Sequence, residues 1–445
     1  MKILVIGSGG REHALTWKLR ERQLMDEIYC APGNAGIAQE AECISVDLSS
    51  PAEIVEVAAR LKADLTVIGP EAPLVGGVVD LLHKAGLPVV GPNQAAAALE
   101  GSKVFSKNFM QKHGIPTARF VTAETFEGAV RALGDFPSPW VIKADGLAAG
   151  KGVTLAKTRE EAERCLDALM RQGSLGRAGE RVVIEECLRG EELSMIVLTD
   201  GRTQLPLALS QDHKALYDND EGPNTGGMGA TSEDSILSAA YQEEIQRTIV
   251  EPTLAGLRSD GLNYRGFLYI GLMLTPDGPR VLEYNVRLGD PEAQPIMMRL
   301  RTDLASLLQA VCEERLAAVD LHWTPNPAVC VVLASRGYPG APEIGKPVSG
   351  YEVAETLGGV KVFHAGTRFE DHQLLTSGGR VLGVTATAED LSSAIQLCYA
   401  GVSKIAFEGM QFRKDIGAKA LAASKARVPA LGGPGTSSRR PSPHT

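Results

Sequence analysis

Short apolar runs alternate with amphipathic stretches in the N-terminal part of the chain. The first run, KILVI at 2–6, is followed by strand-like segments at 27–30, 44–46, 65–68 and 89–90. Helical periodicity separates these segments, at 10–22, 52–61 and 78–85. Runs as apolar as the first are typical of strands that are buried on both faces of a parallel sheet. The alternation therefore predicts a doubly wound α/β domain.

The predicted strands end in loops rich in Gly, Pro, Asn or Glu, at the edge where ligands bind in open α/β sheets. The first loop, Gly7–His13, precedes a helix N-terminus that suits an anion. It resembles a dinucleotide fingerprint, but Glu12 occupies the third glycine position and no acid follows the second strand. A phosphate or a phosphorylated sugar therefore fits better than NAD. Glycines that serve only the tight turn are the alternative.

The segment VIKADGLAAGKGV at 141–153 predicts a nucleotide-binding loop. A short strand delivers Lys143, and glycines surround Lys151 before a second strand begins. These glycines are Gly146, Gly150 and Gly152. Backbone N–H groups freed by glycines, together with two ammonium groups, suit a polyphosphate. The spacing does not match a P-loop, so we expect a hairpin that folds over a triphosphate; a plain tight hairpin with solvated lysines is the alternative.

This loop belongs to a small α/β unit between residues 115 and 190. We expect strands at 118–121 and 182–188, and helices at 126–133 and 160–170. The last strand, VVIEECL, is expected beside the Lys143 strand, with free backbone amides at a sheet edge. Glu192, which follows it, can reach a sugar diol.

A strand hairpin at 266–284 leads into the sequence EYNVRLGDPE, which begins at Glu283. Alternate residues of a strand share one face, so Glu283, Asn285 and Arg287 line up. Carboxylate and amide oxygens are hard ligands that suit Mg²⁺ or Mn²⁺, with phosphate oxygens completing the coordination. The alternative is an edge strand on which Glu283 and Arg287 form an ion pair.

Composition narrows the class of protein. A net charge of −9 and a pI near 5.5 argue against a general nucleic-acid binder. The seven cysteines are scattered without a Cys-x-x-Cys, as in a protein with reduced thiols. No stretch is long and apolar enough for a membrane span, and the N-terminus does not read as a signal peptide. We expect a cytoplasmic protein with neither a membrane nor a nucleic-acid partner.

Breaks in these patterns predict the domains. Residues 1–102 are expected to form a Rossmann-like substrate domain, with a boundary near a helical stretch at 95–113. Residues 103–325 are expected to form a second domain, with a long helix at 239–256. A small α/β domain at 326–424 follows, with strands at 328–334, 361–365 and 380–387 and a helix at 391–402. Residues 425–445 lack apolar periodicity and are expected to be disordered. The fold class is α/β in each domain and α+β overall.

Several stretches together resemble one family. In order, they are GSGGREHAL, APGNAG, GPEAPL, LEGSK, IKADGLAAGKGV, QDHK, GPNTGGMGA, GDPEAQP, KVFHAGT and RKDIG. From Met1 to about Ala422 the chain is similar to the glycinamide ribonucleotide synthetases of the ATP-grasp superfamily. The resemblance implies a pre-ATP-grasp domain, a two-lobed ATP-grasp domain with 120–188 as its mobile lobe, and a C-terminal domain.

The resemblance also implies a reaction, the ATP-dependent carbon–nitrogen ligation of de novo purine biosynthesis. ATP phosphorylates the carboxylate of glycine, and the amine of 5-phosphoribosylamine displaces phosphate from the resulting glycyl phosphate. The products are glycinamide ribonucleotide, ADP and phosphate. Such catalysis depends on positioning and charge neutralisation, and on a lid that keeps water from the acyl phosphate. The implied partners are these small molecules, with the enzyme a monomer or a weak dimer.

Roles of individual residues follow from the same resemblance. Lys103 and Lys143 would contact the α- and β-phosphates, and Glu283 and Asn285 would hold Mg²⁺ or Mn²⁺. Arg287 would offset charge on the transferring phosphoryl group. The candidate catalytic residues are Arg287, Lys143 and Asp290. The adenine and ribose of ATP would contact Glu185, Glu186, Leu188 and Glu192.

The substrate side is implied in the same way. Glycine and phosphoribosylamine would lie against Asp212, Lys214, Asn224, Thr225, Gly226, Gly227, Arg287, Gly289 and Asp290. The ribose and phosphate of phosphoribosylamine would lie against Gly9, Gly10, Arg11, Asn34 and Glu71.

One feature departs from the pattern of many ATP-grasp enzymes. Many ATP-grasp enzymes carry a second metal carboxylate on the strand that here reads FLYIGLM at 267–273, without an acid. The number of protein-bound metals therefore stays open.

Three histidines are candidates for catalysis. His13 is expected to orient its loop and His364 to be structural, and His213 is not needed as a base because the attacking amine is already nucleophilic.

Three other functions are alternatives. Another ATP-grasp carboxylate–amine ligase or a carboxylase would differ in GPNTGGMGA and QDHK, which lie on the substrate side. An NAD(P)-dependent oxidoreductase needs the acid that is missing after the second strand. A nucleotide-binding module without catalysis would tolerate the substitution Glu283→Ala.

Overall fold

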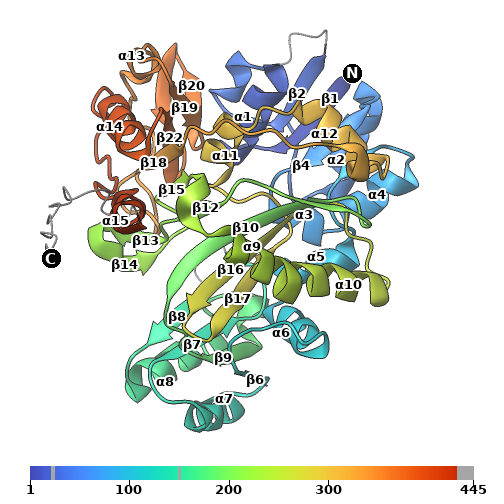
Figure 1. Ribbon diagram of the computed structural model, residues 1–445, viewed down its shortest axis with the longest axis vertical. Coiled ribbons are helices and arrows are strands. Elements are labelled where there is room, and N and C mark those ends of the chain that lie inside the picture. Colours follow the sequence, from blue (N-terminus) through green and yellow to red (C-terminus); the bar gives the residue numbers. More distant parts are fainter. Residues whose placement is uncertain (22–25, 149–151, 428–445) are drawn as a thin grey trace, which may run out of the picture.

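The computed structural model describes residues 1–21, 26–148 and 152–427, except the side chains of 424–427. A small lobe formed by residues 120–186 projects from a larger body (Figure 1). At the far end of that body, the N-terminal and C-terminal parts of the chain contact each other, since the backbone N–H of His364 donates to Nδ1 of His13 at 2.7 Å.

The N-terminal sheet is parallel, with the strand order β3-β2-β1-β4-β5. Its strands are β1 (Lys2–Gly7), β2 (Glu27–Pro32), β3 (Glu42–Cys43), β4 (Leu65–Ile68) and β5 (Val89–Val90). The helices beside it are α1 (Gly10–Arg20), α2 (Pro51–Leu61), α3 (Glu71–Val75) and α4 (Val78–Lys84). β1 lies in the middle with all of its apolar side chains buried, as its composition predicts. The doubly wound α/β domain is confirmed.

The third strand is predicted too late in the sequence. β3 pairs through Glu42 and Cys43 with Tyr29 and Cys30, whereas the expected strand was 44–46. Ile44 and Val46 are apolar because they pack into the core after the chain has left the ladder. Apolar patterning therefore locates burial here, and not the strand itself.

The small lobe is an antiparallel sheet with the order β6-β9-β7-β8. Its elements are β6 (Phe120–Ala123), α7 (Phe126–Ala132), β7 (Trp140–Ala144), β8 (Val153–Ala156), α8 (Arg159–Met170) and β9 (Val182–Glu186). β9 pairs with β7, so the predicted neighbour of the Lys143 strand is confirmed. The predicted free edge of β9 is wrong, because β6 pairs with its other side.

An antiparallel sheet runs through the rest of the molecule in the order β17-β16-β10-β12-β15-β18-β22-β19, and β11 also pairs with β10. Its first strands are β10 (Glu191–Thr199), β11 (Gln204–Pro206), β12 (Ser210–Asp212), β15 (Gly229–Ser232), β16 (Gly266–Thr275) and β17 (Gly278–Asn285). The C-terminal strands are β18 (Ala328–Ala334), β19 (Val360–His364) and β22 (Arg380–Thr387). β15 pairs with β18, so this sheet continues across the predicted domain boundary at 325/326.

Two short hairpins and the remaining helices complete the fold. The hairpins are β13 (Ala215–Tyr217) with β14 (Glu221–Asn224), and β20 (Thr367–Glu370) with β21 (Gln373–Thr376). The helices are α5 (Gln94–Gly101), α6 (Lys103–Lys112), α9 (Ala239–Ile245), α10 (Glu251–Ser259), α11 (Ala293–Arg299), α12 (Leu304–Cys312), α13 (Tyr351–Glu355), α14 (Leu391–Val402) and α15 (Ala418–Arg427).

Two of these helical segments differ from the sequence expectation. The stretch expected at 95–113 is two helices, because Ser102 ends α5 with extended backbone angles and caps α6 through its hydroxyl. α15 reaches Arg427, so the first residues assigned to the disordered tail are helical. Residues 428–445 of that tail lie outside the described residues. No helix among residues 1–21, 26–148 and 152–427 is long and apolar enough to cross a bilayer.

Candidate active site

The strand β17 presents Glu283 through a break in its pairing with β16. Gly271 lies opposite Glu283 but Leu272 lies opposite Val281, so Leu282 is an extra residue, as in a β-bulge. Val281 is buried in the core, whereas Leu282 and Glu283 both keep some exposure. The carbonyl of Leu282 accepts a hydrogen bond from the ammonium group of Lys143 at 2.9 Å. The bulge therefore joins the predicted metal strand to the predicted phosphate lysine.

Cationic groups surround Glu283. Its carboxylate oxygens lie 3.5 Å from Nζ of Lys214 and 3.9 Å from Nζ of Lys103. Burial by itself raises the pKa of this carboxyl, but Lys214, Lys103 and Lys143 outweigh burial and hold the pKa at about 2. Glu283 is therefore ionised at neutral pH. The ammonium groups of Lys103, Lys143 and Lys214 thus gather at this strand end, which suits a polyanionic ligand.

Glu283 and Asn285 offer one carboxylate and one amide oxygen at the end of β17. Among the residues that the structure describes, no group of three or more His, Cys, Asp or Glu side chains is arranged to hold a metal ion. The two oxygens are hard donors and fit a divalent cation that takes its other ligands from phosphate and water. Gly271 of β16 lies opposite Glu283, so this neighbouring position supplies no second carboxylate.

Arg287 is held by two carboxylates from the N-terminal part of the chain. Its guanidinium lies 3.0 Å from Oε1 of Glu100 and 3.4 Å from Oε2 of Glu71. Glu100 also accepts the backbone N–H of Val286 at 2.7 Å. Burial by itself lowers the pKa of Arg287, but Glu100 and Glu71 raise it above its usual range. Arg287 thus pairs with Glu100 and Glu71, whereas the edge-strand alternative requires an ion pair with Glu283.

The hairpin of β7 and β8 is anchored at its base. The backbone N–H of Ala144 donates to the carbonyl of Gly152 at 2.8 Å. Asp145 accepts hydrogen bonds from the hydroxyl of Ser102 at 2.7 Å and from the backbone N–H of Val104 at 3.1 Å. The loop therefore starts beside the N-terminus of α6, which carries Lys103. Gly150 and Lys151 lie outside the described residues.

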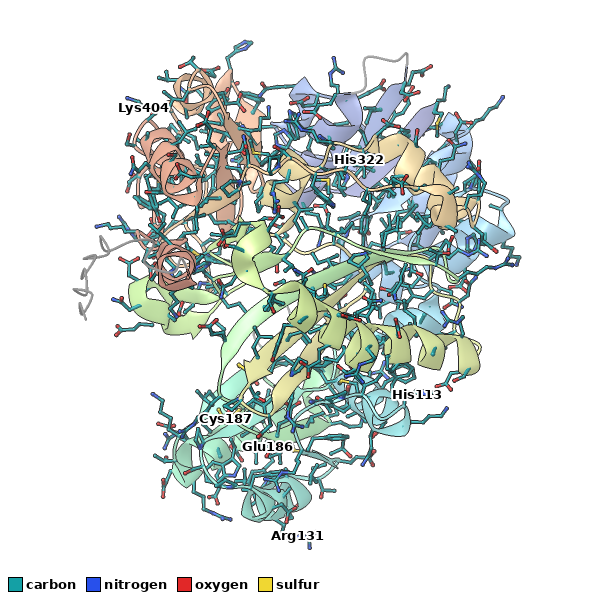
Figure 2. All side chains as sticks on the ribbon, in the orientation of Figure 1. His113, Arg131, Glu186, Cys187, His322 and Lys404 are labelled. Atoms are coloured by element: carbon teal, nitrogen blue, oxygen red, sulfur yellow. The ribbon has the colours of Figure 1, made fainter. Side chains whose placement is uncertain are left out.

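The end of β9 lies where the small lobe joins β10, and Glu186 and Cys187 mark this junction in Figure 2. The carboxylate of Glu185 is buried between Lys107 and Lys143, at 3.0 Å from each ammonium group. The carboxylate of Glu186 binds the side chain of Arg119 at 2.8 Å and its backbone N–H at 2.9 Å. Leu188 lies beyond the strand, between β9 and β10.

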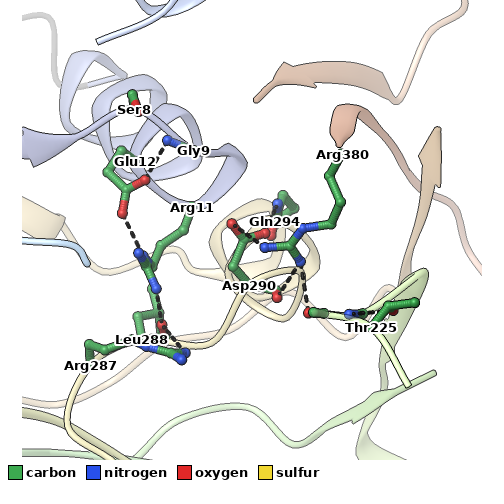
Figure 3. A network of polar contacts seen from close by, with 12 residues as sticks. Ser8, Gly9, Arg11, Glu12, Thr225, Arg287, Leu288, Asp290, Gln294 and Arg380 are labelled. Atoms are coloured by element: carbon green, nitrogen blue, oxygen red, sulfur yellow. Dashed lines mark hydrogen bonds and ion pairs between the residues drawn. The ribbon is translucent and has the colours of Figure 1, made fainter. Parts of the chain in front are cut away.

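Asp290 and Arg380 join the central and C-terminal parts of the chain (Figure 3). The guanidinium of Arg380 lies 3.3 Å from the Asp290 carboxylate and donates to the carbonyl oxygens of Asp290 at 2.7 Å and of Gly226 at 2.8 Å. Gln294 donates to Asp290 at 2.9 Å. Burial by itself raises the pKa of Asp290, but Arg380 and Arg11 keep it below its usual range.

The loop after β1 is filled by its own glutamate. The carboxylate of Glu12 accepts the backbone N–H of Gly9 at 2.6 Å and Nε of Arg11 at 2.5 Å. A Cβ added at Gly7 or Gly69 would lie within 2.5 Å of Glu12 side-chain atoms, so these glycines make room for it. The anion at this helix N-terminus is the protein's own carboxylate, that of Glu12. The structural alternative for the loop glycines therefore applies to Gly7.

Arg11 and Gly10 face the segment around Asp290. Arg11 donates to the carbonyl of Leu288 at 3.1 Å, and a Cβ on Gly10 would lie 3.6 Å from Asp290 Oδ1. The amide of Asn34 is engaged within the protein, because its NH₂ donates to the carbonyls of Ser8 and His364 at 2.9 and 2.8 Å. Its oxygen accepts two backbone N–H groups of its own loop. Asn34 therefore fixes this loop against the C-terminal part of the chain.

Lys214, Asp212 and Glu192 line a cavity of about 470 Å³ next to Glu283. Lys214 lies 3.6 Å from Glu192 and 3.5 Å from Glu283. Burial, and then the charge of Glu292, raise the pKa of Asp212 well above its usual range. Asn224 also lines this cavity.

The segment after Asn224 closes against its surroundings. The hydroxyl of Thr225 donates to the carbonyl of Lys214 at 2.8 Å and accepts the backbone N–H of Gly227 at 3.0 Å. A Cβ on Gly289 would lie 2.4 Å from Oε2 of Glu292, so Gly289 allows that carboxylate to lie against the backbone. Most of the sequence-predicted substrate residues therefore lie at two places, the cavity beside Lys214 and the junction around Asp290. Glu71 instead pairs with Arg287, and Asn34 is engaged within the protein.

Comparison with known proteins decides the family. Models of the phosphoribosylglycinamide synthetase N domain, ATP-grasp (A) domain and C domain match residues 1–100, 101–293 and 328–419. The chain belongs to the phosphoribosylglycinamide synthetase family. Phosphoribosylamine–glycine ligases from Allochromatium vinosum and Pseudomonas aeruginosa are 50% and 48% identical over 425 residues, covering 95% of this chain and 99% of each relative.

Solved structures agree with this family. The phosphoribosylamine–glycine ligase of Thermotoga maritima has a TM-score of 0.81 at 36% identity, covering 94% of this chain and 100% of that one. The biotin carboxylase domain of the Hydrogenobacter thermophilus 2-oxoglutarate carboxylase, in complex with MgADP, has a TM-score of 0.70 at 16% identity, covering 92% and 91%. The second likeness shows a shared fold.

The three histidines of this synthetase family member that were considered as catalysts, His13, His213 and His364, are buried. Burial lowers the pKa of His213 to about 4 and that of His364 to about 3. His13 is buried against Phe363 with its pKa lowered in the same direction. These groups are neutral at physiological pH.

Four residues of the site escaped the sequence analysis: Glu100, Lys107, Glu292 and Arg380. Glu100 and Glu292 lie within the family stretches LEGSK and GDPEAQP, so their neighbourhood was marked but not their roles. Lys107 lies one helical turn after Lys103 on α6, which is a weak signal. Nothing in the sequence around Arg380 connects it with Asp290, ninety residues earlier.

Proposed function

We propose that this protein ligates glycine to 5-phosphoribosylamine with ATP, through a glycyl phosphate intermediate, and forms glycinamide ribonucleotide, ADP and phosphate. The observation that carries the proposal is the end of β17, where Glu283, Asn285 and Arg287 meet the ammonium groups of Lys103 and Lys214. A triphosphate beside a divalent cation matches this mixture of hard oxygens and cations. The family membership supplies the choice of substrates.

Glu283 and Asn285 would hold the cation, Mg²⁺ or Mn²⁺. When bound, it would supply Lewis-acid neutralisation of the phosphate oxygens. Lys103 and Lys143 lie on either side of the same strand end, where they hold the α- and β-phosphates in place. The hairpin that begins at Ala144 excludes water from the acyl phosphate.

Arg287 offsets the charge on the transferring phosphoryl group. Glu100 and Glu71 fix its guanidinium before the reaction, so no reorganisation is needed in the transition state. Its contact with Oδ1 of Asn285 at 3.2 Å keeps it next to the metal strand.

Glycine binds in the cavity beside Lys214, where an ammonium group faces its carboxylate. Phosphoribosylamine binds between the loop at Gly9–Arg11 and the junction of Asp290 with Arg380. Its amine attacks without a general base, because an unprotonated amine is already nucleophilic. The remaining features fit a cytoplasmic enzyme, because all seven cysteines are unpaired.

The test is substrate dependence. Purified protein with Mg-ATP should release ADP and phosphate only when both glycine and phosphoribosylamine are present. Turnover with neither, or with bicarbonate in place of glycine, would contradict the proposal and favour an ATP-grasp carboxylase. A change of nicotinamide fluorescence on titration with NAD(P)H would favour the oxidoreductase alternative instead.

A further inference from the structure

A buried ion triad lies between the small lobe and the body. The Glu185 carboxylate of β9 forms ion pairs with Lys143 of β7 through Oε2 and with Lys107 of α6 through Oε1, each at 3.0 Å. The side chains of Lys107, Glu185 and Lys143 are 2%, 2% and 5% exposed. Two cations therefore share one anion away from water, where an unpaired charge is strongly unfavourable.

The two lysines of this triad face different surroundings. Lys143 also donates to the carbonyl of Leu282, next to Glu283, and contributes to the low pKa of Glu283. Lys107 instead donates to the hydroxyl of Thr117 at 2.6 Å, which donates in turn to the carbonyl of Val281 at 2.6 Å. Lys143 thus borders the place proposed for the phosphates, and Lys107 is tied to the base of the small lobe.

Binding of a triphosphate changes the balance of the triad. Lys143 already contacts Glu185 and the carbonyl of Leu282, so binding to phosphate oxygens would weaken its pairing with Glu185 and leave that buried carboxylate more dependent on its other partner. Lys107 stays paired with the other carboxylate oxygen, because its second contact is with Thr117 at the base of the small lobe and not with the ligand. The charge of Lys107 therefore keeps Glu185 from becoming an unpaired buried carboxylate when Lys143 turns toward the phosphates.

We propose that Lys107 is a positioning residue of the nucleotide site, which neutralises Glu185 so that Lys143 is free to bind the phosphates. The inference rests on the proposed function only in taking ATP as the ligand. It assigns to Lys107 no contact with the substrates.

The test measures binding of Mg²⁺ with the non-hydrolysable analogue AMP-PNP by calorimetry. The variant K107M keeps the apolar stem and removes the charge, and K107R keeps the charge. We expect K107M to raise the Kd of the analogue about ten- to a hundredfold and K107R to restore most of the affinity. The matched control is K112M on the same helix, since Lys112 is 62% exposed and pairs only with Asp260 among the described residues. K112M is expected to bind as the wild type does.

Steady-state kinetics supply the second readout. The KM for ATP should rise in K107M while the KM values for glycine and phosphoribosylamine stay within about twofold of the wild type. A folded K107M that binds the analogue as tightly as the wild type would overturn the inference. An equal rise in all three KM values would also overturn it, as the mark of a general structural defect.

A double-mutant cycle covers the case in which K107M does not fold. If Lys107 acts through the charge of Glu185, then E185Q and E185Q/K107M should have the same Kd for the analogue. A further loss of affinity in the double variant would overturn the inference. Because analogue binding needs neither glycine nor phosphoribosylamine, failure of the ligase assay alone would reject the proposed function and leave the role of Lys107 standing.

Discussion

At the scale of single residues, the site is built from charges that are held before any ligand arrives. Glu283 keeps its negative charge because lysines surround it, and Arg287 keeps its orientation because Glu100 and Glu71 bind it from two sides. Neither carboxylate partner of Arg287 is on its own strand. A guanidinium fixed in this way stabilises developing charge without reorganising.

Arg287→Lys is expected to lower kcat about a hundredfold, because an ammonium group cannot engage both carboxylates and still point at the phosphoryl group. The KM for ATP should change much less, and steady-state kinetics at saturating glycine would measure both. Arg258→Lys, at an exposed position of α10, is the matched control. A kcat within about threefold of the wild type would show that the orientation of Arg287 does not matter.

The charge of Lys107 predicts a pH dependence. The pKa of this ammonium is lowered from its ordinary 10.5 to about 8, chiefly by burial. The charge of Lys143 also lowers it, whereas Glu185 and Glu186 raise it. Above about pH 8 Lys107 loses its proton and Glu185 loses a neutralising partner, so the KM for ATP should rise. This rise should be absent in K107R.

The same deprotonation of Lys107 weakens ATP binding but favours the folded state. Between the folded pKa near 8 and the unfolded value of 10.5, the unfolded chain binds more protons, so this group makes the free energy of unfolding increase with pH. A KM for ATP that stays flat from pH 7 to pH 10 would contradict the predicted pKa. Chemical denaturation at the same pH values checks the stability part.

At the scale of elements, the hairpin of β7 and β8, which is proposed above to exclude water, has a constrained backbone at its base. Gly146 has a φ of +141°, and a Cβ there would lie 2.9 Å from the Cβ of Ala178. Asp145 beside it is bound to Ser102. The turn is therefore specified by the backbone and by a contact with the body.

Gly146→Ala is expected to destabilise the small lobe by about 1–3 kcal/mol, because the alanine has an unfavourable φ and too little room. Hydrogen exchange of the β8 amides should become faster, and the KM for ATP should rise. Gly134→Ala in the same lobe is the control, since a Cβ there meets nothing within 4 Å. Equal exchange rates in the two variants would contradict the account of the lid.

Elements with a local signature were predictable, and contacts between distant segments were not. KILVI at 2–6 is buried on both faces, and Glu283 and Asn285 lie on β17 as predicted. The strand ends at Asn285, however, so Arg287 comes after it and contacts Asn285 only through its side chain. The edge position of β9 was wrong because β6 pairs with it from sixty residues earlier. Arg380 could not be placed at all, since its partners Asp290 and Gly226 come together only through the folded sheet.

At the scale of the whole molecule, one sheet links the central and C-terminal parts while the small lobe has a sheet of its own. The pairing of β15 with β18 and the contacts of Arg380 cross between the central and C-terminal parts. Among the described residues, no strand of the lobe's sheet pairs with a strand of the body, and just before the lobe the isolated bridge of Thr117 with Val281 attaches the chain to β17. Closure of the lobe is therefore the motion that the architecture permits most readily.

Native-state hydrogen exchange should reveal this division. Amides of β10, β18 and β22 should share one opening free energy, because their sheet is continuous. Amides of β7 and β9 should open at a lower free energy. Separate unfolding of β18 and β22 ahead of β10 would contradict the argument from the continuous sheet.

The central claim, that Glu283 and Asn285 seat a divalent ion beside the phosphates, is tested most directly by diffraction from crystals grown with Mn²⁺ and AMP-PNP. An anomalous peak is predicted about 2.1 Å from an oxygen of each side chain, with phosphate oxygens completing its coordination. A manganese peak elsewhere in the molecule, with these two side chains unliganded, would contradict the account.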